Sequence, residues 1–244
     1  MIISHEHKYL FVELPRTGTT AIAKELIENY KGEKILTKHA HYDDFLKQAS
    51  NEEKNYFVFS CIRNPIDRTL TRYYKLKTKY MNPKEDIARF RRQGRRVRLQ
   101  TYYLYLQYKF IQNKNASFSQ YIKRFYFFPY DDWSLKHHQN FDFIIRFENL
   151  SEDFDVLLEK LGVEKVRDLP LVNKTPSKEK SYLEILKDAD EKTKKRVKHV
   201  FGYYMLKWGY KFPASWGEFK LSNNTKFQLK VLNFFRKVYW RYLK

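Results

Sequence analysis

The protein has 244 residues, of which 43% are hydrophobic and 18% are aromatic, and its formal net charge is +20. This composition excludes a globally disordered chain, because it supplies enough apolar surface for a sizeable core. The length suits one domain with a small appendage. The strong positive charge predicts a polyanionic partner, which is a nucleic acid, an acidic membrane surface, or an acidic glycan or nucleotide.

Buried strands alternate with helices along much of the chain. The strands predicted from short apolar runs are 8–14, 56–62 and 141–147. The helices predicted after them are 19–30, 66–80 and 151–162. We expect Thr19 or Thr20 to cap the first helix and Gly162 to end the third. This alternation predicts an α/β fold with a central parallel sheet flanked by helices.

The remaining segments predict a single domain with an insertion and a terminal helix. Residues 81–140 interrupt the alternation and have a helical pattern rich in basic and aromatic residues, and residues 181–209 are also predicted to be helical. We therefore expect a domain over residues 1–220, with 81–140 inserted on the acceptor side, followed by a basic amphipathic helix over 221–244.

The only cysteine and the short apolar runs restrict the class of protein further. Cys61 lies inside the apolar run "YFVFSCI", which favours a buried structural role over a nucleophilic one. One cysteine excludes an intrachain disulfide framework and a cysteine-based zinc site. No signal peptide is visible and no run reaches the roughly 18 apolar residues of a membrane span. We expect a cytoplasmic or peripheral membrane protein.

The stretch "FVELPRTGTTAI", residues 11–22, has the pattern of an anion-binding loop. A loop between a buried strand and a helix places free backbone N–H groups at the positive end of the helix dipole. Gly18 allows close approach of the backbone, and Arg16 adds a guanidinium. The hydroxyl groups come from Thr17, Thr19 and Thr20. An ordinary strand–turn–helix with a capping threonine is the alternative, since the loop lacks the lysine of a P-loop.

A second basic residue follows the next buried strand. In "CIRNPIDRTLTRYY", Arg63 leaves the strand and Thr71 lies about two turns into the following helix. A guanidinium and a hydroxyl in this arrangement can bind a second phosphate. This second motif favours the anion-binding interpretation of the first loop over an ordinary strand–turn–helix.

These motifs resemble those of the sulfotransferases that use 3′-phosphoadenosine 5′-phosphosulfate (PAPS). "LPRTGTT" is similar to the family's 5′-phosphosulfate loop and "RNPIDRTLTRYY" to its 3′-phosphate motif, while "FDFIIRFENLSEDFDVLLEKLGV", "LPLVNKT" and "FGYYMLKWGYKF" resemble later segments of the carbohydrate-type branch. The resemblance covers about residues 8–213. It implies a P-loop NTPase-like fold and sulfuryl transfer from PAPS to a hydroxyl group, without a required metal. Two departures are conservative in chemistry: Arg16 replaces the usual lysine, and Thr71 replaces the usual serine.

The resemblance also implies roles for individual residues. Arg16 is expected at the bridging or 5′-phosphate oxygens, and Arg63 and Thr71 at the 3′-phosphate. The cradle for the 5′-phosphosulfate is expected from Thr17, Gly18, Thr19 and Thr20. Sulfuryl transfer otherwise depends on positioning and on stabilisation of the charge that develops on the leaving phosphate.

The acceptor hydroxyl needs a general base, and a histidine suits this task. "TKHAHYDDF", residues 37–45, lies between the two anion motifs. It is similar to the stretch that carries the base in the glycan 2-O-sulfotransferase branch, which assigns the role to His39 and leaves His41 in reserve. Asp43 or Asp44 is expected either to orient the imidazole or to cap a helix.

The acceptor side is predicted less sharply. Residues 87–124 carry ten basic residues and no acidic one, interleaved with aromatic residues. This pattern indicates an acidic acceptor site or a solvated basic helix, and a nucleic-acid groove is less favoured because the two phosphate motifs already account for an anion. The candidate acceptor-side residues are Arg95, Arg96, His137 and His138. The acceptor expected is a glycan, a lipid-linked sugar or a small metabolite.

The C-terminal segment "TKFQLKVLNFFRKVYWRYLK" combines an apolar stripe with basic residues and contains no acidic residue. Such a helix suits an anionic membrane surface, the domain itself or a second subunit. Two other functions remain open at this stage. One is a nucleotide kinase or NTPase of related fold, and the other is a non-catalytic basic module that binds nucleic acid or membrane.

Overall fold

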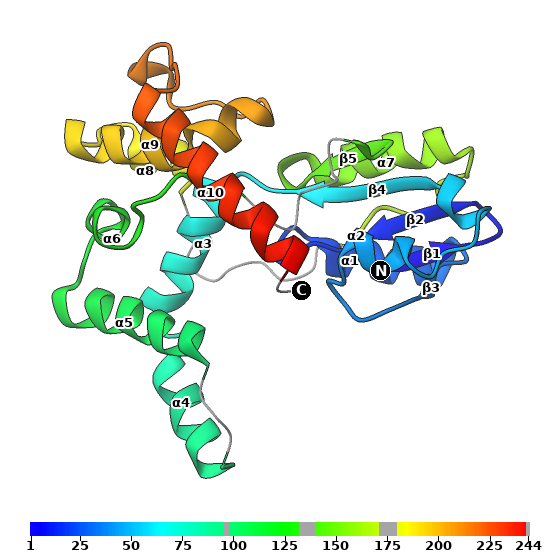
Figure 1. Ribbon diagram of the computed structural model, residues 1–244, viewed down its shortest axis with the longest axis horizontal. Coiled ribbons are helices and arrows are strands. Elements are labelled where there is room, and N and C mark those ends of the chain that lie inside the picture. The colour runs from blue at the N-terminus through cyan, green and yellow to red at the C-terminus, as the bar shows by residue number, and fades with distance from the viewer. Residues whose placement is uncertain (95–97, 132–139, 171–179, 243–244) are drawn as a thin grey trace. The chain divides into compact units, whose positions relative to one another are not determined.

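The computed structural model describes residues 1–94, 98–131, 140–170 and 180–242. These residues form two compact units, whose elements are labelled in Figure 1. The sheet unit contains residues 1–64 and 140–170, and the helical unit contains residues 65–131 and 180–242. The boundary between the units falls between Asn64 and Pro65, directly after a strand and at the first residue of a helix.

The described part of the sheet unit contains a five-stranded sheet in the order β3-β1-β2-β4-β5. The strands are β1 Ile2–Ser4, β2 Tyr9–Val12, β3 Glu33–Lys34, β4 Phe57–Ile62 and β5 Phe143–Arg146. The strands β2, β4 and β5 run parallel, whereas β1 pairs antiparallel with both β2 and β3. The predicted α/β fold is confirmed, and the three strands predicted from the sequence, now β2, β4 and β5, are parallel to one another. The sheet as a whole is mixed, because β1 runs antiparallel to its neighbours. Only residues 5–8 connect β1 to β2, and so short a connection joins strands only as an antiparallel hairpin.

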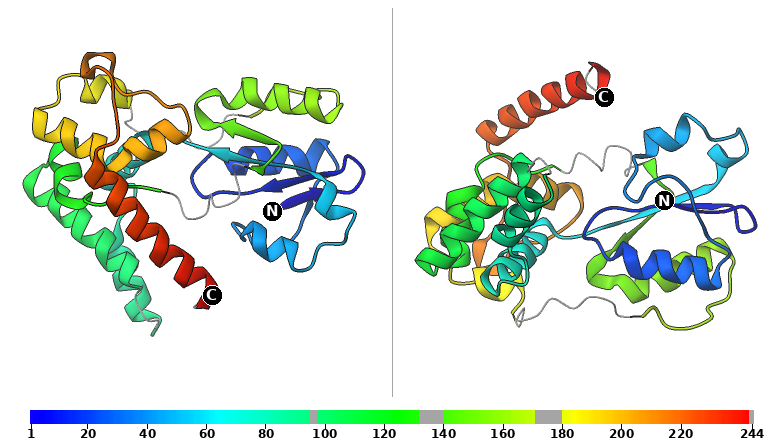
Figure 2. Two further views of the ribbon diagram at one scale, coloured as in Figure 1. Left: turned by 45° about the horizontal axis from the view of Figure 1, so that its top comes forward. Right: turned by 90° about the horizontal axis from the view of Figure 1, so that it is seen from below.

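Helices cover both faces of this sheet. Tyr9 and Phe11 of β2 pack on the face covered by α1 (Thr19–Asn29) and α7 (Leu150–Leu161), and Leu10 and Val12 pack on the face covered by α2 (Tyr42–Leu46). Figure 2 shows these helices on opposite sides of the sheet. Each of the four β2 side chains is at most 2% exposed. Burial of one such side chain contributes roughly 1.5–3 kcal/mol, so β2 is firmly held in the sheet.

The parallel strands bring their carboxyl ends to one edge of the sheet. The chain leaves β2 into the loop 13–18, leaves β4 at Arg63 and leaves β5 at Phe147. Short 3-10 helices, η1 (Glu53–Asn55) and η4 (Phe147–Asn149), precede β4 and follow β5. Ligands of open α/β sheets bind outside this edge, so the two motifs predicted to bind phosphate lie where the fold places ligands.

The helical unit is built around an apolar cluster of its own. Its helices are α3 Pro65–Lys77, α4 Pro83–Arg92, α5 Leu99–Lys114, α6 Phe118–Phe125, α8 Tyr182–Leu186, α9 Glu191–Lys207, η5 Ala214–Trp216 and α10 Asn223–Tyr242. Ile66, Leu70 and Tyr73 share one face of α3, as their spacing requires, and pack in this cluster with residues of α5, α6 and α9. The helices predicted at 66–80 and 181–209, and the helical character of 81–140, are confirmed over the described residues.

The last helix, α10, is attached to the helical unit by one face. Thr225 and Leu229 are buried on this face, and the Thr225 hydroxyl lies 2.8 Å from Nδ1 of His199. About two helical turns after Leu229, Arg236 donates a hydrogen bond to the Asp131 carboxylate at 2.9 Å, and both of these side chains are nearly buried. The other face of α10 therefore points away from the core of this unit.

Candidate active site

The loop that follows β2 has the backbone of a tight anion-binding turn. Arg16 and Gly18 both adopt left-handed backbone conformations, with φ of 70° and 82°. A Cβ at Gly18 would lie 3.0 Å from Cδ2 of Phe147 and 3.3 Å from Cδ2 of Leu150, so both the dihedral angle and the space require glycine. Gly18 is the N-cap of α1, and it has no side chain with which to cap the helix. The predicted threonine cap is therefore wrong, because the N-cap makes no side-chain hydrogen bond to the first turn of α1.

Two of the threonines use their hydroxyl groups inside the loop. The hydroxyls of Thr17 and Thr19 each donate to the carbonyl of Leu14 at 3.1 Å, and both residues are 2% exposed. They brace the loop against the end of β2. Arg16 and Thr20 of this loop are exposed to solvent.

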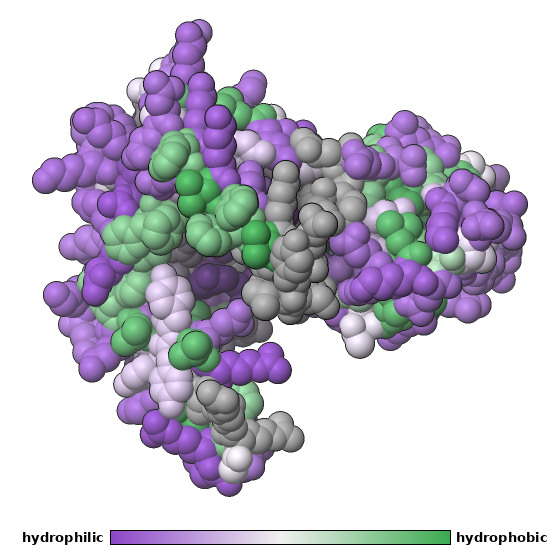
Figure 3. Space-filling model, viewed as in Figure 1, coloured by the Kyte–Doolittle hydropathy of each residue, from purple (hydrophilic) through white to green (hydrophobic). Residues whose placement is uncertain are grey.

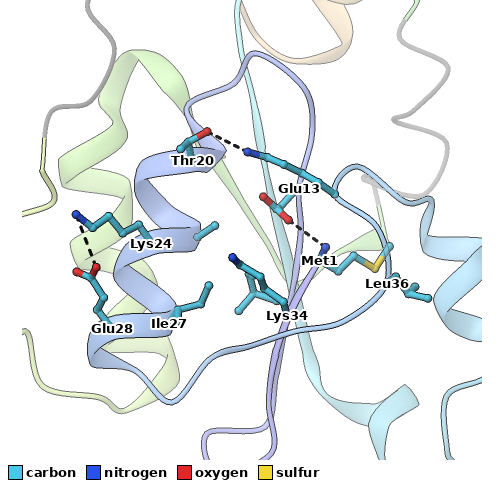
Figure 4. A pocket seen from close by; sticks show the side chains of 11 residues that line it. Met1, Glu13, Thr20, Lys24, Ile27, Glu28, Lys34 and Leu36 are labelled. Atoms are coloured by element: carbon cyan, nitrogen blue, oxygen red, sulfur yellow. Dashed lines mark hydrogen bonds and ion pairs between the residues drawn. The ribbon is translucent and has the colours of Figure 1, made fainter.

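A lysine not predicted from the sequence extends this cationic surface. Lys38 Nζ donates to the Thr20 hydroxyl at 3.3 Å (Figure 4). Lys38 lies in the loop between β3 and α2, far from Thr20 in sequence, so the approach is tertiary. Its only signal in the sequence is its position directly before His39, in the segment already suspected of carrying the base.

His39 is held at the end of β2 by a backbone contact. Its Nδ1 lies 3.1 Å from the carbonyl oxygen of Glu13, and Glu13 is the first residue after β2. A carbonyl oxygen only accepts a hydrogen bond, so Nδ1 is the donor in this contact, and in the neutral form of the imidazole Nε2 carries the lone pair. His39 is exposed and has a φ of 66°, a left-handed conformation that costs on the order of 1 kcal/mol for a residue other than glycine.

His41 has a different local role. It is the N-cap of α2 and forms a capping box with Asp44, whose carboxylate accepts the His41 backbone N–H at 3.3 Å. Asp44 also accepts from Lys47 at 3.3 Å. Of the two roles expected for an aspartate in this segment, Asp44 therefore performs the capping one.

Arg63 is fixed beside the same loop. Its guanidinium lies 3.9 Å from the centroid of the Phe147 ring and donates to the Arg16 carbonyl at 3.5 Å. The next residue, Asn64, donates its backbone N–H to the Glu148 carboxylate at 2.8 Å. These contacts link the ends of β2, β4 and β5. The Phe147 ring lies against the Arg63 guanidinium and also fills the position next to Gly18 that a Cβ atom would need.

The other predicted site residues divide into two groups. Thr71 lies on α3 in the helical unit and is 9% exposed. The acceptor-side candidates Arg95, Arg96, His137 and His138 lie outside the described residues. In the described part of 81–140, Arg89 pairs with Asp86 at 2.6 Å and Arg91 donates to the Tyr102 hydroxyl at 3.3 Å. Both contacts lie on exposed helix surface, as the solvated-helix interpretation of this segment expects.

Cys61 is fully buried on the face of the sheet covered by α1 and α7, and burial raises the pKa of its thiol well above its ordinary value. This environment is that of a structural cysteine.

Within the described ranges, no group of three or more His, Cys, Asp or Glu side chains is arranged to hold a metal ion. No helix in the described part of the chain is both long and apolar enough to cross a membrane.

One of three comparisons with known proteins gives a match. The family model described as "Sulfotransferase family" matches residues 1–211. The protein therefore belongs to the sulfotransferase family, whose members transfer sulfuryl groups to acceptor hydroxyls. No curated protein and no solved structure matches the chain in the corresponding searches.

Proposed function

We propose that this sulfotransferase uses PAPS as its donor, a glycan or glycoconjugate hydroxyl as its acceptor, and His39 as its general base. The contact of His39 with the Glu13 carbonyl carries the proposal, because it fixes the imidazole next to the loop after β2. Family membership supports the donor class, since sulfotransferases generally use PAPS.

The loop after β2 fits a phosphosulfate group chemically. The N-cap glycine leaves the first-turn amides of α1 without a side-chain acceptor, and an anion satisfies such amides well. The Arg16 guanidinium and the Lys38 ammonium add positive charge on the exposed side of the loop. A donor bound here places its 5′-phosphosulfate against residues 16–20.

The reaction then requires one proton transfer and stabilisation of one developing charge. Nε2 of His39 takes the proton of the acceptor hydroxyl while the acceptor oxygen forms its bond to sulfur. The bond between sulfur and the 5′-phosphate oxygen breaks, and negative charge grows on that phosphate. Arg16, Lys38 and the α1 amides stabilise this charge, an effect that commonly supplies the largest share of catalysis.

Arg63 and Thr71 remain the proposed ligands of the 3′-phosphate. Support for Arg63 comes from its fixed position beside the Arg16 carbonyl, and support for Thr71 comes from the sequence motif alone. Because ADP has no 3′-phosphate, we expect 3′-phosphoadenosine 5′-phosphate to bind at least tenfold more tightly than ADP, as one charge-assisted contact allows. Isothermal titration calorimetry measures both affinities. Equal affinities would rule out a PAPS-specific site and favour a kinase or NTPase.

Variants at Arg63 and the histidines separate binding from chemistry. Arg63→Gln should remove the preference for the 3′-phosphate. His39→Ala should keep the affinity for 3′-phosphoadenosine 5′-phosphate and lower turnover about 10²- to 10⁴-fold in an acceptor screen with labelled PAPS. His41→Ala is the matched control, because His41 caps α2. Loss of turnover in His41→Ala with normal turnover in His39→Ala would move the base to His41.

We also propose that α10 binds an anionic membrane surface. Phe227, Val231 and Phe234 share the face of α10 opposite to its buried face, and their side chains are 64%, 38% and 64% exposed. Figure 3 shows hydrophobic side chains in a row along this helix. Lys226 and Lys230 lie beside the row, and no acidic residue occurs in α10, so the surface suits acidic lipids.

Vesicle sedimentation tests the membrane proposal. The protein should bind vesicles of phosphatidylserine and phosphatidylcholine, and vesicles of phosphatidylcholine alone should bind it much more weakly. The double variant Phe227→Ser/Phe234→Ser should bind at least tenfold less, because two exposed rings are lost. Leu206→Ser, at a 50% exposed position on α9, is the control. Equal binding of both variants would exclude the stripe as the membrane contact.

A further inference from the structure

A pocket of about 410 Å³ lies in the sheet unit between α1 and the segment that follows β3. One wall is a single face of α1, and the opposite wall comes from β1 and residues 34–38 (Figure 4). Ala23, Ile27 and Leu36 supply apolar surface, and Lys34 and Lys38 lie on the opposite wall. The volume is in the range of pockets that enclose small ligands.

The charge of this pocket is positive because its carboxylates already have cationic partners. The Glu13 carboxylate accepts from the Met1 amino group at 3.0 Å. The Glu28 carboxylate pairs with Lys24 at 3.7 Å and with Arg167 at 2.7 Å. Lys38 contacts a hydroxyl group rather than a carboxylate. The two lysines of the wall opposite α1, Lys34 and Lys38, therefore leave a net positive field inside the pocket.

The pocket adjoins the candidate active site on two sides. Thr20, which lines it, is in the first turn of α1 and directly follows the loop proposed to hold the phosphosulfate. Glu13, which also lines it, holds the His39 imidazole through its carbonyl. Lys38 is the neighbour of His39 in the chain. A ligand in the pocket therefore lies beside both the proposed base and the proposed donor loop.

We propose that this pocket binds the acceptor, and that the acceptor is a small amphipathic glycoconjugate that carries a carboxylate. Lys34 binds its carboxylate, the apolar residues of α1 and Leu36 contact its sugar face or alkyl portion, and its hydroxyl is directed toward His39. The assignment rests on the proposed sulfuryl transfer. It places acceptor recognition in the sheet unit, whereas the sequence alone suggests the basic segment 81–140.

Two glycosides that differ in one group test the proposal directly. Hexyl β-D-glucuronide carries a carboxylate where hexyl β-D-glucoside carries a hydroxymethyl group. Isothermal titration calorimetry measures the dissociation constant of each glycoside, first without nucleotide and then with saturating 3′-phosphoadenosine 5′-phosphate. The glucuronide should bind about tenfold more tightly than the glucoside, as one charge-assisted hydrogen bond in an open pocket allows.

Charge variants locate the binding site. Lys34→Ala should weaken glucuronide binding about tenfold and leave glucoside binding unchanged, and Lys34→Glu should weaken glucuronide binding further. Lys34 is exposed, so both variants are expected to fold. Lys160→Ala removes the same charge from an exposed position on α7 that does not line the pocket, and it should behave like the unaltered protein.

The outcomes separate this inference from the proposed function. Equal affinities for the two glycosides, no binding of either, or unchanged glucuronide affinity in Lys34→Ala each overturns the pocket assignment. If 3′-phosphoadenosine 5′-phosphate nevertheless binds in preference to ADP, the proposed donor stands. Conversely, Lys34-dependent glucuronide binding without any preference for the 3′-phosphate refutes the donor and supports the pocket as an anion site.

Discussion

Gly18→Ala probes the central geometric feature of the candidate site. Alanine at a φ of 82° costs about 1–2 kcal/mol, because its Cβ is too close to the following carbonyl oxygen. The new methyl group would also lie 3.0 Å from Phe147 and 3.3 Å from Leu150. Overpacking of this kind typically adds about 1–3 kcal/mol. The sum predicts a loss of about 2–5 kcal/mol in the free energy of unfolding of the sheet unit.

Gly162→Ala is the matched control for this substitution. Gly162 ends α7 in the same unit at a φ of 66°, and a Cβ there would meet nothing within 4 Å. It should therefore show the cost of the dihedral angle alone, about 1–2 kcal/mol. The difference between the two variants isolates the crowding against Phe147 and Leu150.

Native-state amide hydrogen exchange of β2 and β4 is the suitable assay. Tryptophan fluorescence does not isolate the sheet, because Trp208 and Trp216 belong to the helical unit. Exchange of the central strand amides gives the unfolding free energy of the sheet itself. If Gly18→Ala costs no more than Gly162→Ala, the crowding argument is refuted. If neither variant is destabilised, the argument from positive φ fails as well.

Three further predictions concern individual side chains. Cys61 should resist iodoacetamide in the native protein and react in urea, since burial raises its pKa; rapid alkylation of the native protein, measured by mass spectrometry, would contradict this. Arg167→Ala should cost about 1–3 kcal/mol in urea unfolding, because the fully buried Glu25 carboxylate loses the guanidinium that contacts it at 2.8 Å, whereas Lys160→Ala should cost almost nothing. Asp190→Ala should lower the urea midpoint, because Asp190 accepts from Lys123 at 2.9 Å and caps α9. These contacts lower the pKa of Asp190, so its stabilisation is present above about pH 4 and is lost as the pH falls through the lowered pKa. A difference between the two proteins that does not shrink as the pH falls below about 4 would argue against this linkage.

Local patterns in the sequence account for the elements that hold the site. The apolar runs at 8–14 and 56–62 and the helical patterns after them match β2, β4, α1 and α3 to within a few residues. Central parallel strands are buried on both faces and are therefore continuously apolar, so each of them can be predicted from a single sequence as a short apolar run. The same patterns place Arg16 and Arg63 after neighbouring parallel strands, and the structure joins them through the Arg16 carbonyl.

The sequence does not reveal β1 and β3, which are too short to show an alternating pattern, and without them the antiparallel pairing at this edge cannot be predicted. The domain boundaries predicted at 220 and 221 stay a prediction, and the division found between Asn64 and Pro65 has no compositional signal.

The orientation of α10 likewise needed the structure, because one apolar stripe suits a membrane, the domain or a second subunit equally well. The contacts of Thr225 and Arg236 decide which face is buried.

By itself, the sequence determined which residues form the candidate site: an arginine and a glycine in a strand–loop–helix, a second arginine after the next strand, and a histidine between them. The tertiary structure alone decided how these groups are supported. The Glu13 carbonyl orients His39, Lys38 reaches Thr20, and Phe147 lies against both Gly18 and Arg63. Periodicity records which residues are buried and in which element, but it carries no information about which distant side chains meet. For that reason Lys34 and its pocket also became visible only in the folded chain.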